Sequence, residues 1–257
     1  MISGAGLVFL HGAGARGEVW QLQALAFPQA VIPDLPGRDG RGTPHAVADH
    51  VAALRPHLER AAVAVGHSLG GAIVLQYALE QPPRLRGIVL VATGARLRVR
   101  PEWLEGLERD YLATTAEIVA HFYAPSTPDR LRQKSLEVMR HLPQQVTRAD
   151  FLSADGFDVR DRLGGVLVPA LVICGILDEM TPLRYSEFLH AHLPQAELVA
   201  IEGAGHMVML EQPQAVSEAI RGFLRRLTGA PTGEPPPSPR PTAPSPAPSL
   251  DARGRGS

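Results

Sequence analysis

The stretch Val65–Gly71, with the sequence Val-Gly-His-Ser-Leu-Gly-Gly, constrains the fold of this chain more than any other. The apolar run before it, at 61–65, predicts a short buried strand, and the apolar residues 72–79 after it predict a buried helix. So sharp a turn strains the backbone and crowds the neighbouring strand and helix, and the flanking glycines relieve the crowding. The pattern therefore predicts that Ser68 stands at the carboxyl edge of a sheet, where the N–H groups of a helix start favour a developing anion.

The composition of the 257-residue chain narrows the classes of partner. Its formal net charge is −1 and it has no long run of like charges, which argues against nucleic acid and against an acidic membrane surface. The single cysteine, Cys174, lies in an apolar run; this excludes an internal disulfide framework and favours a buried core residue in a reducing compartment. We therefore expect a cytoplasmic protein. The first residues show no basic region followed by an apolar stretch, so we expect no signal peptide and no membrane span.

The composition changes abruptly at Gly229. The segment 229–257 holds nine of the 24 prolines, mixed with Ser, Ala, Gly and Thr, and has one leucine and no aromatic residue. Such a segment buries too little apolar surface to offset the entropy lost on ordering. We expect a disordered tail; a proline-rich ligand segment is the alternative.

Short apolar runs recur along the rest of the chain and predict strands. They lie at residues 6–10, 30–33, 61–65, 87–92, 170–174 and 197–201. Helical patterns separate most of them, and the run at 87–92 is continuously apolar, as in a parallel strand covered on both faces. The alternation predicts an α/β fold with about six mostly parallel strands flanked by helices.

One long interval interrupts this alternation. Between residues 93 and 168 the chain shows only amphipathic helical patterns, at 101–112, 115–122, 128–141 and 144–153. We expect a helical cap over 95–163, inserted after the fourth strand above the carboxyl edge of the sheet. The core would then comprise residues 1–94 and 164–228.

Serine chemistry requires further groups near Ser68. A serine hydroxyl is a weak nucleophile, so it needs a base, a group that orients the base, and donors for the oxyanion. Asp178 and His206 each lie in a loop that follows a predicted strand, and thus at the same edge as Ser68. Glu179 and Glu202 compete as acids, but Glu179 would point away from the site and Glu202 ends its strand.

Other polar residues have simpler explanations. His11 and His67 flank backbone that the site would use, so we expect them to shape loops. The pair at His190 and His192 has no third ligand at a suitable spacing, which predicts no metal site. The glycines at 12–14 lack the spacing of a nucleotide fingerprint, and we expect no cofactor.

Five motifs in order resemble the α/β-hydrolase superfamily, in particular its serine esterase and lipase-like members with a helical cap. These motifs are His11–Gly14, Asp34–Gly37, Gly66–Gly71, Gly175–Pro182, and Gly205–His206 followed by Glu211–Pro213. The resemblance implies Ser68 as nucleophile, His206 as base and Asp178 as its orienter. It also implies an oxyanion hole from the backbone N–H groups of Ala13 and Leu69. Few residues precede the first strand, so we expect a sheet of about six strands without the two leading strands of the full family sheet.

The substrate is predicted less sharply. Aromatic residues gather in the 95–160 interval, and two methionines flank the acid and the base. Candidates for substrate binding are Trp103, Tyr111, Phe122, Tyr123, Met180 and Met207. We expect a small to medium, partly apolar carboxylic ester, hydrolysed through an acyl-enzyme. Serine at the elbow argues against epoxide and haloalkane hydrolases, which use aspartate on this fold.

Several other activities stay open on the same residues. The scaffold also supports hydrolysis of carbon–carbon bonds, lactones or amides, cofactor-free perhydrolysis, lyase chemistry and acyl transfer. A slow-turnover ligand receptor is the alternative outside ordinary enzymes. Turnover of short p-nitrophenyl esters would separate a hydrolase from a receptor.

Overall fold

The computed structural model describes residues 6–40 and 42–229, and in them a parallel sheet of five strands. The strands lie side by side in sequence order: β1 (Leu7–Leu10), β2 (Val63–His67), β3 (Gly87–Val91), β4 (Ala170–Gly175) and β5 (Ala196–Ile201). Because all of them are parallel, the loops that follow them meet at one edge of the sheet.

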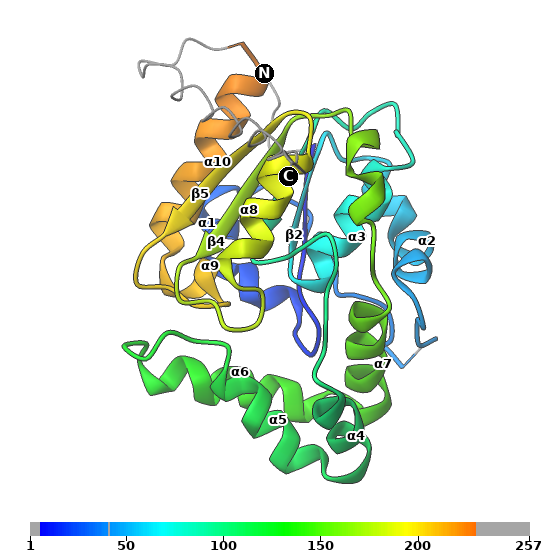
Figure 1. The fold of residues 1–257 in the computed structure, drawn as a ribbon, viewed down its shortest axis with the longest axis vertical. Coiled ribbons are helices and arrows are strands. Elements are labelled where there is room, and N and C mark those ends of the chain that lie inside the picture. Colours follow the sequence, from blue (N-terminus) through cyan, green and yellow to red (C-terminus); the bar gives the residue numbers. More distant parts are fainter. Residues whose placement is uncertain (1–5, 41, 230–257) are drawn as a thin grey trace, which may run out of the picture.

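Helices cover both faces of this sheet (Figure 1). One face carries α2 (Val47–Leu58), α3 (Leu69–Ala78) and α8 (Leu183–His192). The other carries the short helices η2 (Gly17–Trp20), α1 (Gln21–Ala26) and α9 (Val208–Glu211), together with α10 (Pro213–Leu227).

The strands supply two hydrophobic cores, one to each face. In β1, Val8 and Leu10 pack into the core under α2 and α3, whereas Leu7 and Phe9 pack into the core under α10. All four residues are buried, as expected when a period-2 side-chain pattern meets helices on both sides. The prediction of parallel strands covered on both faces is confirmed, and Cys174 is a buried core residue as expected.

The strand expected at 30–33 is absent from the sheet, which corrects the predicted count of about six. Only Val31 pairs with β1, through a single bridge to Val8, with Val31 accepting from the Phe9 N–H at 2.9 Å. Pro33 has no N–H to continue the ladder, and the chain turns away there. The helical interval accordingly follows the third strand of the sheet, and not the fourth.

Four helices fill that interval: α4 (Pro101–Arg109), α5 (Tyr111–Ala120), α6 (Asp129–His141) and α7 (Gln144–Asp155). We call residues 101–155 the helical insertion. Figure 1 shows α4, α5 and α6 gathered at one end of the sheet. The insertion lies against the loops at the carboxyl edge, since the Met207 N–H donates to the Phe122 carbonyl at 3.0 Å.

The two ends of the insertion are joined by a short antiparallel neck. Arg96 bridges Asp158, the Val159 N–H donates to the Ala95 carbonyl at 2.8 Å, and the Leu97 N–H donates to the Phe157 carbonyl at 3.3 Å. The chain therefore leaves and re-enters the core at nearly the same point. The short helix η3 (Arg160–Gly165) then leads to β4.

Two predictions concern the ends of the chain and the membrane. The segment predicted to be disordered, 229–257, lies outside the described residues from 230 onward. Among the helices of the described part, none combines the length and the apolar character that crossing a membrane requires.

Candidate active site

Ser68 lies at a strained turn between β2 and α3. Its backbone angles are φ 52° and ψ −117°, a region that residues with a Cβ rarely adopt. The surrounding structure holds this conformation: the Ser68 N–H donates to the Val91 carbonyl at 3.0 Å, and the Thr93 hydroxyl donates to the Ser68 carbonyl at 2.7 Å. A Cβ at Gly66 would collide with the backbone of Gly70, so the turn requires glycine there.

Asp178 and His206 form a buried pair at the carboxyl ends of β4 and β5. Nδ1 of His206 lies 2.9 Å from Oδ2 of Asp178, and both side chains are almost fully buried. Asp178 also accepts from the backbone N–H groups of Met180 and Thr181 and from the Thr181 hydroxyl, at 2.7–2.9 Å. Neither Glu179 nor Glu202 takes this place; both side chains are exposed.

The environment keeps Asp178 ionised. Burial raises the pKa of this carboxyl, but the charge and hydrogen bond of His206 and the donors of Thr181 outweigh burial and lower its pKa to about 2. An ionised carboxylate accepts the proton on Nδ1 of His206. The ring is then held in the tautomer whose Nε2 is free to take a proton.

A second histidine, His67, packs against the first. The two ring centroids are 4.7 Å apart, and Nε2 of His67 lies 3.0 Å from the His206 carbonyl oxygen. Burial, together with the charge of His206, lowers the pKa of His67 to about 3, so its ring is neutral and Nε2–H donates to that carbonyl. His67 thus supports the backbone of His206, consistent with a loop-shaping role.

Two backbone N–H groups have no hydrogen-bond partner among the described residues; one directly follows Ser68, and the other directly follows Gly12, where a Cβ would lie 3.1 Å from Cβ of Ser68. They belong to Ala13, in the loop after β1, and to Leu69, at the first position of α3. We call residues 11–15 the β1 loop. Its shape depends on His11: the Leu35 N–H donates to Nε2 of that ring at 2.9 Å, so Nδ1 carries the proton and donates to the Gly12 carbonyl at 2.9 Å. The peptide that contains the Ala13 N–H is held by this bond.

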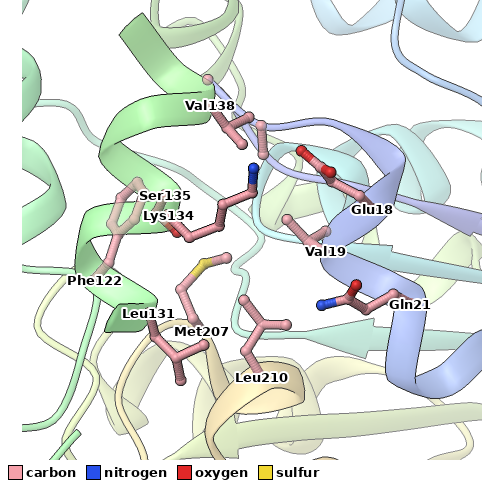
Figure 2. Close-up of a pocket in the computed structure, with 12 residues that line it drawn as sticks. Glu18, Val19, Gln21, Phe122, Leu131, Lys134, Ser135, Val138, Met207 and Leu210 are labelled. Carbon is pink, nitrogen blue, oxygen red and sulfur yellow. The ribbon is translucent and has the colours of Figure 1, made fainter. Parts of the chain in front are cut away.

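A pocket of about 80 Å³ lies between the helical insertion and the core (Figure 2). Its lining residues are Gly14, Ala15, Glu18, Val19, Gln21, Phe122, Leu131, Lys134, Ser135, Val138, Met207 and Leu210. Figure 2 shows Met207 and Leu210 projecting between α6 and the segment that carries Glu18 and Gln21. The pocket adjoins the buried pair, because Met207 follows His206 and the Phe122 ring centroid is 5.8 Å from that of His206.

Of the six predicted substrate-binding residues, the structure places Phe122 and Met207 at this pocket. Tyr123 lies behind the wall, where its hydroxyl is 2.6 Å from Oγ of Ser135. Trp103 bonds to Glu117 within the insertion. Tyr111 also bonds within the insertion, its hydroxyl lying 3.0 Å from Oγ1 of Thr147, and Met180 lies beside the acid.

Sequence reasoning missed the wall that α6 provides. Leu131, Lys134, Ser135 and Val138 line the pocket, and their spacing of three or four residues places them on one helix face. That spacing was visible in the sequence, but α6 is rich in charged residues and resembles a helix exposed to solvent.

The described residues offer no place for a metal ion: within 6–40 and 42–229, no three His, Cys, Asp or Glu side chains are grouped suitably. Ser68, Asp178 and His206 all lie in loops or turns at one edge of the sheet, after strands β2, β4 and β5.

Comparison with known proteins identifies the family of the chain. A family model described as the alpha/beta hydrolase family matches residues 7–219. The chain belongs to this family. As an alpha/beta hydrolase it is an enzyme, and its parallel sheet flanked by helices is the fold of that family.

Several relatives of the chain are esterases. A pimeloyl-[acyl-carrier protein] methyl ester esterase of Vibrio cholerae is 29% identical over 249 residues, covering 88% of this chain and 97% of the relative. A thermophilic esterase of known structure is 33% identical with a TM-score of 0.74, covering 86% of this chain and 90% of that chain. An N-acyl homoserine lactone degrading enzyme of known structure is 28% identical with a TM-score of 0.72, and the match covers 84% of this chain and 92% of that chain.

Proposed function

We propose that this alpha/beta hydrolase is a serine carboxylesterase that hydrolyses small to medium, partly apolar esters through an acyl-enzyme. The observation that carries the proposal is the buried Asp178–His206 pair at the same sheet edge as the strained Ser68. The esterase relatives support the same reaction class.

In the proposed mechanism, Oγ of Ser68 attacks the ester carbonyl carbon while Nε2 of His206 takes its proton. The N–H groups of Ala13 and Leu69, which have no partner among the described residues, stabilise the oxyanion. His206 then gives its proton to the departing alcohol. Water, activated by the same base, hydrolyses the acyl-enzyme and restores Ser68.

The pocket suggests where the acyl chain would lie. It adjoins His206 through Met207 and Phe122. Apolar side chains from three elements wall it: Val19 in η2, Leu131 in α6 and Leu210 in α9. Glu18 and Lys134 add charge to the lining. We propose that this pocket takes the acyl chain and that the insertion acts as a cap over 95–163, with 1–94 and 164–228 as the core. The single cysteine, Cys174, supports a cytoplasmic location.

The test combines turnover with labelling. A panel of p-nitrophenyl and methyl esters of increasing acyl length should be hydrolysed, and a fluorophosphonate probe should label Ser68 alone by peptide mapping. Ser68→Ala should lose both activities and keep its fold by circular dichroism. An adduct on another residue, or neither activity in the wild type, would refute the proposal.

Lactone hydrolysis is a second candidate, because one relative of similar fold is a lactone degrading enzyme. Ring opening would use the same nucleophile, base and oxyanion donors, with the alcohol remaining tethered to the acyl group. A comparison of kcat/KM for an N-acyl homoserine lactone and an open-chain ester of equal acyl length decides between them.

A further inference from the structure

Asp150 in α7 makes a buried contact far from its own part of the chain. Its side chain is 1% exposed, and its Oδ2 accepts from the Gly14 N–H at 3.0 Å, across 136 residues of sequence. Gly14 lies in the β1 loop, directly after Ala13. A carboxylate from the helical insertion therefore holds the loop that carries one of the proposed oxyanion donors.

Arg38 completes this contact. Its Nη1 donates to Oδ1 of Asp150 at 3.0 Å and its Nη2 donates to Oδ2, so the pair is bidentate and equally buried on both sides. The same guanidinium donates from Nε and Nη2 to the Ala15 carbonyl, both at 3.2 Å. Asp150 and Arg38 together hold an N–H and a C=O of the β1 loop.

The conformation of the β1 loop is constrained by its neighbours. Gly14 has φ +64°, a left-handed conformation, and a Cβ there would meet Cε of Met139 in α6 at 2.6 Å. His11 holds the peptide that contains the Ala13 N–H, and Asp150 holds the next peptide along the chain. The direction of the Ala13 N–H thus depends on two side chains, one from the core and one from the insertion.

We propose that Asp150 is a positioning residue for the Ala13 oxyanion donor, and that its ion pair with Arg38 couples the helical insertion to the oxyanion hole. The proposal rests on the proposed function, because it takes the Ala13 N–H as a donor to the reacting oxygen. A displacement of α7 would then alter stabilisation of the oxyanion, although α7 does not line the pocket.

Stability alone does not account for this arrangement. Burying two charges costs solvation energy, and apolar pairs of similar volume often hold a fold equally well. An apolar pair, however, could not accept the Gly14 N–H. This difference separates a positioning role from a purely structural one.

The decisive variant removes both charges together. Arg38→Met with Asp150→Leu leaves no unpaired buried charge and frees the Gly14 N–H. We expect cooperative unfolding at a somewhat lower denaturant concentration, because the Gly14 N–H and the Ala15 carbonyl lose their partners. We expect kcat for a short p-nitrophenyl ester to fall about 10- to 100-fold, with KM within about twofold. This is less than the roughly 10²- to 10³-fold cost of deleting a donor outright, since Ala13 keeps its N–H.

Two single variants frame this result. Asp150→Asn retains an acceptor for the Gly14 N–H but weakens the ion pair with Arg38. We therefore expect an intermediate loss in kcat of about tenfold. If the double variant does not fold, this single variant tests the positioning role of Asp150. Asp155→Asn is the matched control: it lies on the same helix and also accepts a backbone N–H, from Val99 at 3.0 Å, away from the β1 loop. Its kcat should stay within twofold of the wild type.

The rate of fluorophosphonate labelling of Ser68 gives a second readout, because the same donors face the phosphoryl oxygen. A folded double variant with wild-type kcat and labelling rate would overturn the proposal. If the wild type hydrolysed no ester, the proposed esterase function would be wrong. The labelling rates would then still test the positioning role of Asp150. Equal labelling of wild type and double variant would then refute it, as would the absence of labelling in both.

Discussion

Ser68, the proposed nucleophile, has an unfavourable backbone conformation. Its φ of 52° costs a residue with a Cβ on the order of 1–3 kcal/mol, whereas glycine adopts this region freely. We therefore predict that Ser68→Gly is inactive but more stable than Ser68→Ala, by about 1 kcal/mol after glycine's larger unfolded-state entropy is subtracted. Urea unfolding of the two inactive variants measures the difference. Equal stabilities would mean that the turn is not strained.

Asp178 should matter for turnover far more than the acidic residues near it. Asp178→Asn keeps the shape of the side chain but favours the wrong His206 tautomer, so kcat should fall on the order of 10⁴-fold by analogy with serine proteases. Glu179→Gln and Glu202→Gln are matched controls, because both side chains are exposed, and should remain within a few-fold of wild type. Retained activity in Asp178→Asn, with loss in Glu202→Gln, would move the acid to Glu202.

For single residues, the sequence predicts the proposed catalytic residues more readily than the residues that position them. Ser68, Asp178 and His206 are predictable because each follows a predicted strand, and parallel strands bring such positions to one edge. Asp150 was not singled out, because a polar residue on a predicted amphipathic helix resembles a solvent-facing one. Its partner Gly14 lies 136 residues away, and no local pattern reports such a contact.

Between elements, the pocket walled by α6 should control the preferred length of the acyl chain. Leu131→Ala removes part of that wall, so the acyl length with the highest kcat/KM should increase. The measurement is a series of p-nitrophenyl esters from acetate to octanoate. Leu112→Ala is the control: this leucine in α5 is 58% exposed and outside the pocket lining, and its length profile should match that of the wild type.

If Leu131→Ala and the wild type showed the same profile, the acyl chain would occupy another surface. In that case, a variant that narrows the opposite wall, Val19→Phe, should also leave the profile unchanged.

Most elements were predictable from periodicity, and the exceptions have local causes. The apolar run at 30–33 has strand-forming residues, but Pro33 cannot donate to a ladder and only Val31 pairs. The charged sequence of α6 concealed a face that lines a pocket, because the long stems of charged side chains cover apolar surface while their head groups reach solvent. The structure of residues 30–33 and the buried face of α6 both depend on which other elements pack against them. The local sequence pattern does not report those contacts.

For the whole molecule, three buried histidines predict loss of stability in acid. Burial lowers the pKa of His67 to about 3 and of His50 to about 4, and burial together with Arg38 holds the pKa of His11 well below its ordinary value. In the unfolded chain each takes up a proton near pH 6.5. Below that pH the unfolded state therefore binds more protons than the folded state. The contribution of these neutral histidines to the free energy of unfolding is complete above about pH 6.5 and is lost on acidification.

His67 and His50 each contribute a slope of up to about 1.4 kcal/mol per pH unit, so the two together should give roughly 2.5 kcal/mol per unit near pH 5, and His11 adds to the slope in the same direction. Urea unfolding at several pH values between 5 and 8 measures this slope. His50→Met is the matched test: neither ring nitrogen of His50 has a hydrogen-bond partner among the described residues, so the substitution removes a titrating group and breaks no bond. The slope should fall by roughly 1 kcal/mol per pH unit near pH 5; an unchanged slope would contradict the assignment.

The antiparallel neck at 95–97 and 157–159 has an evolutionary consequence. Because the backbone between β3 and β4 is already closed there, a descendant gene could receive a different or longer segment between 99 and 155 without shifting strand register. New substrate specificities would then arise by exchange of this segment, while the core that carries Ser68 is retained. Asp150 limits such exchange, because an incoming module must bring its own acceptor for the Gly14 N–H or inherit a misaligned β1 loop.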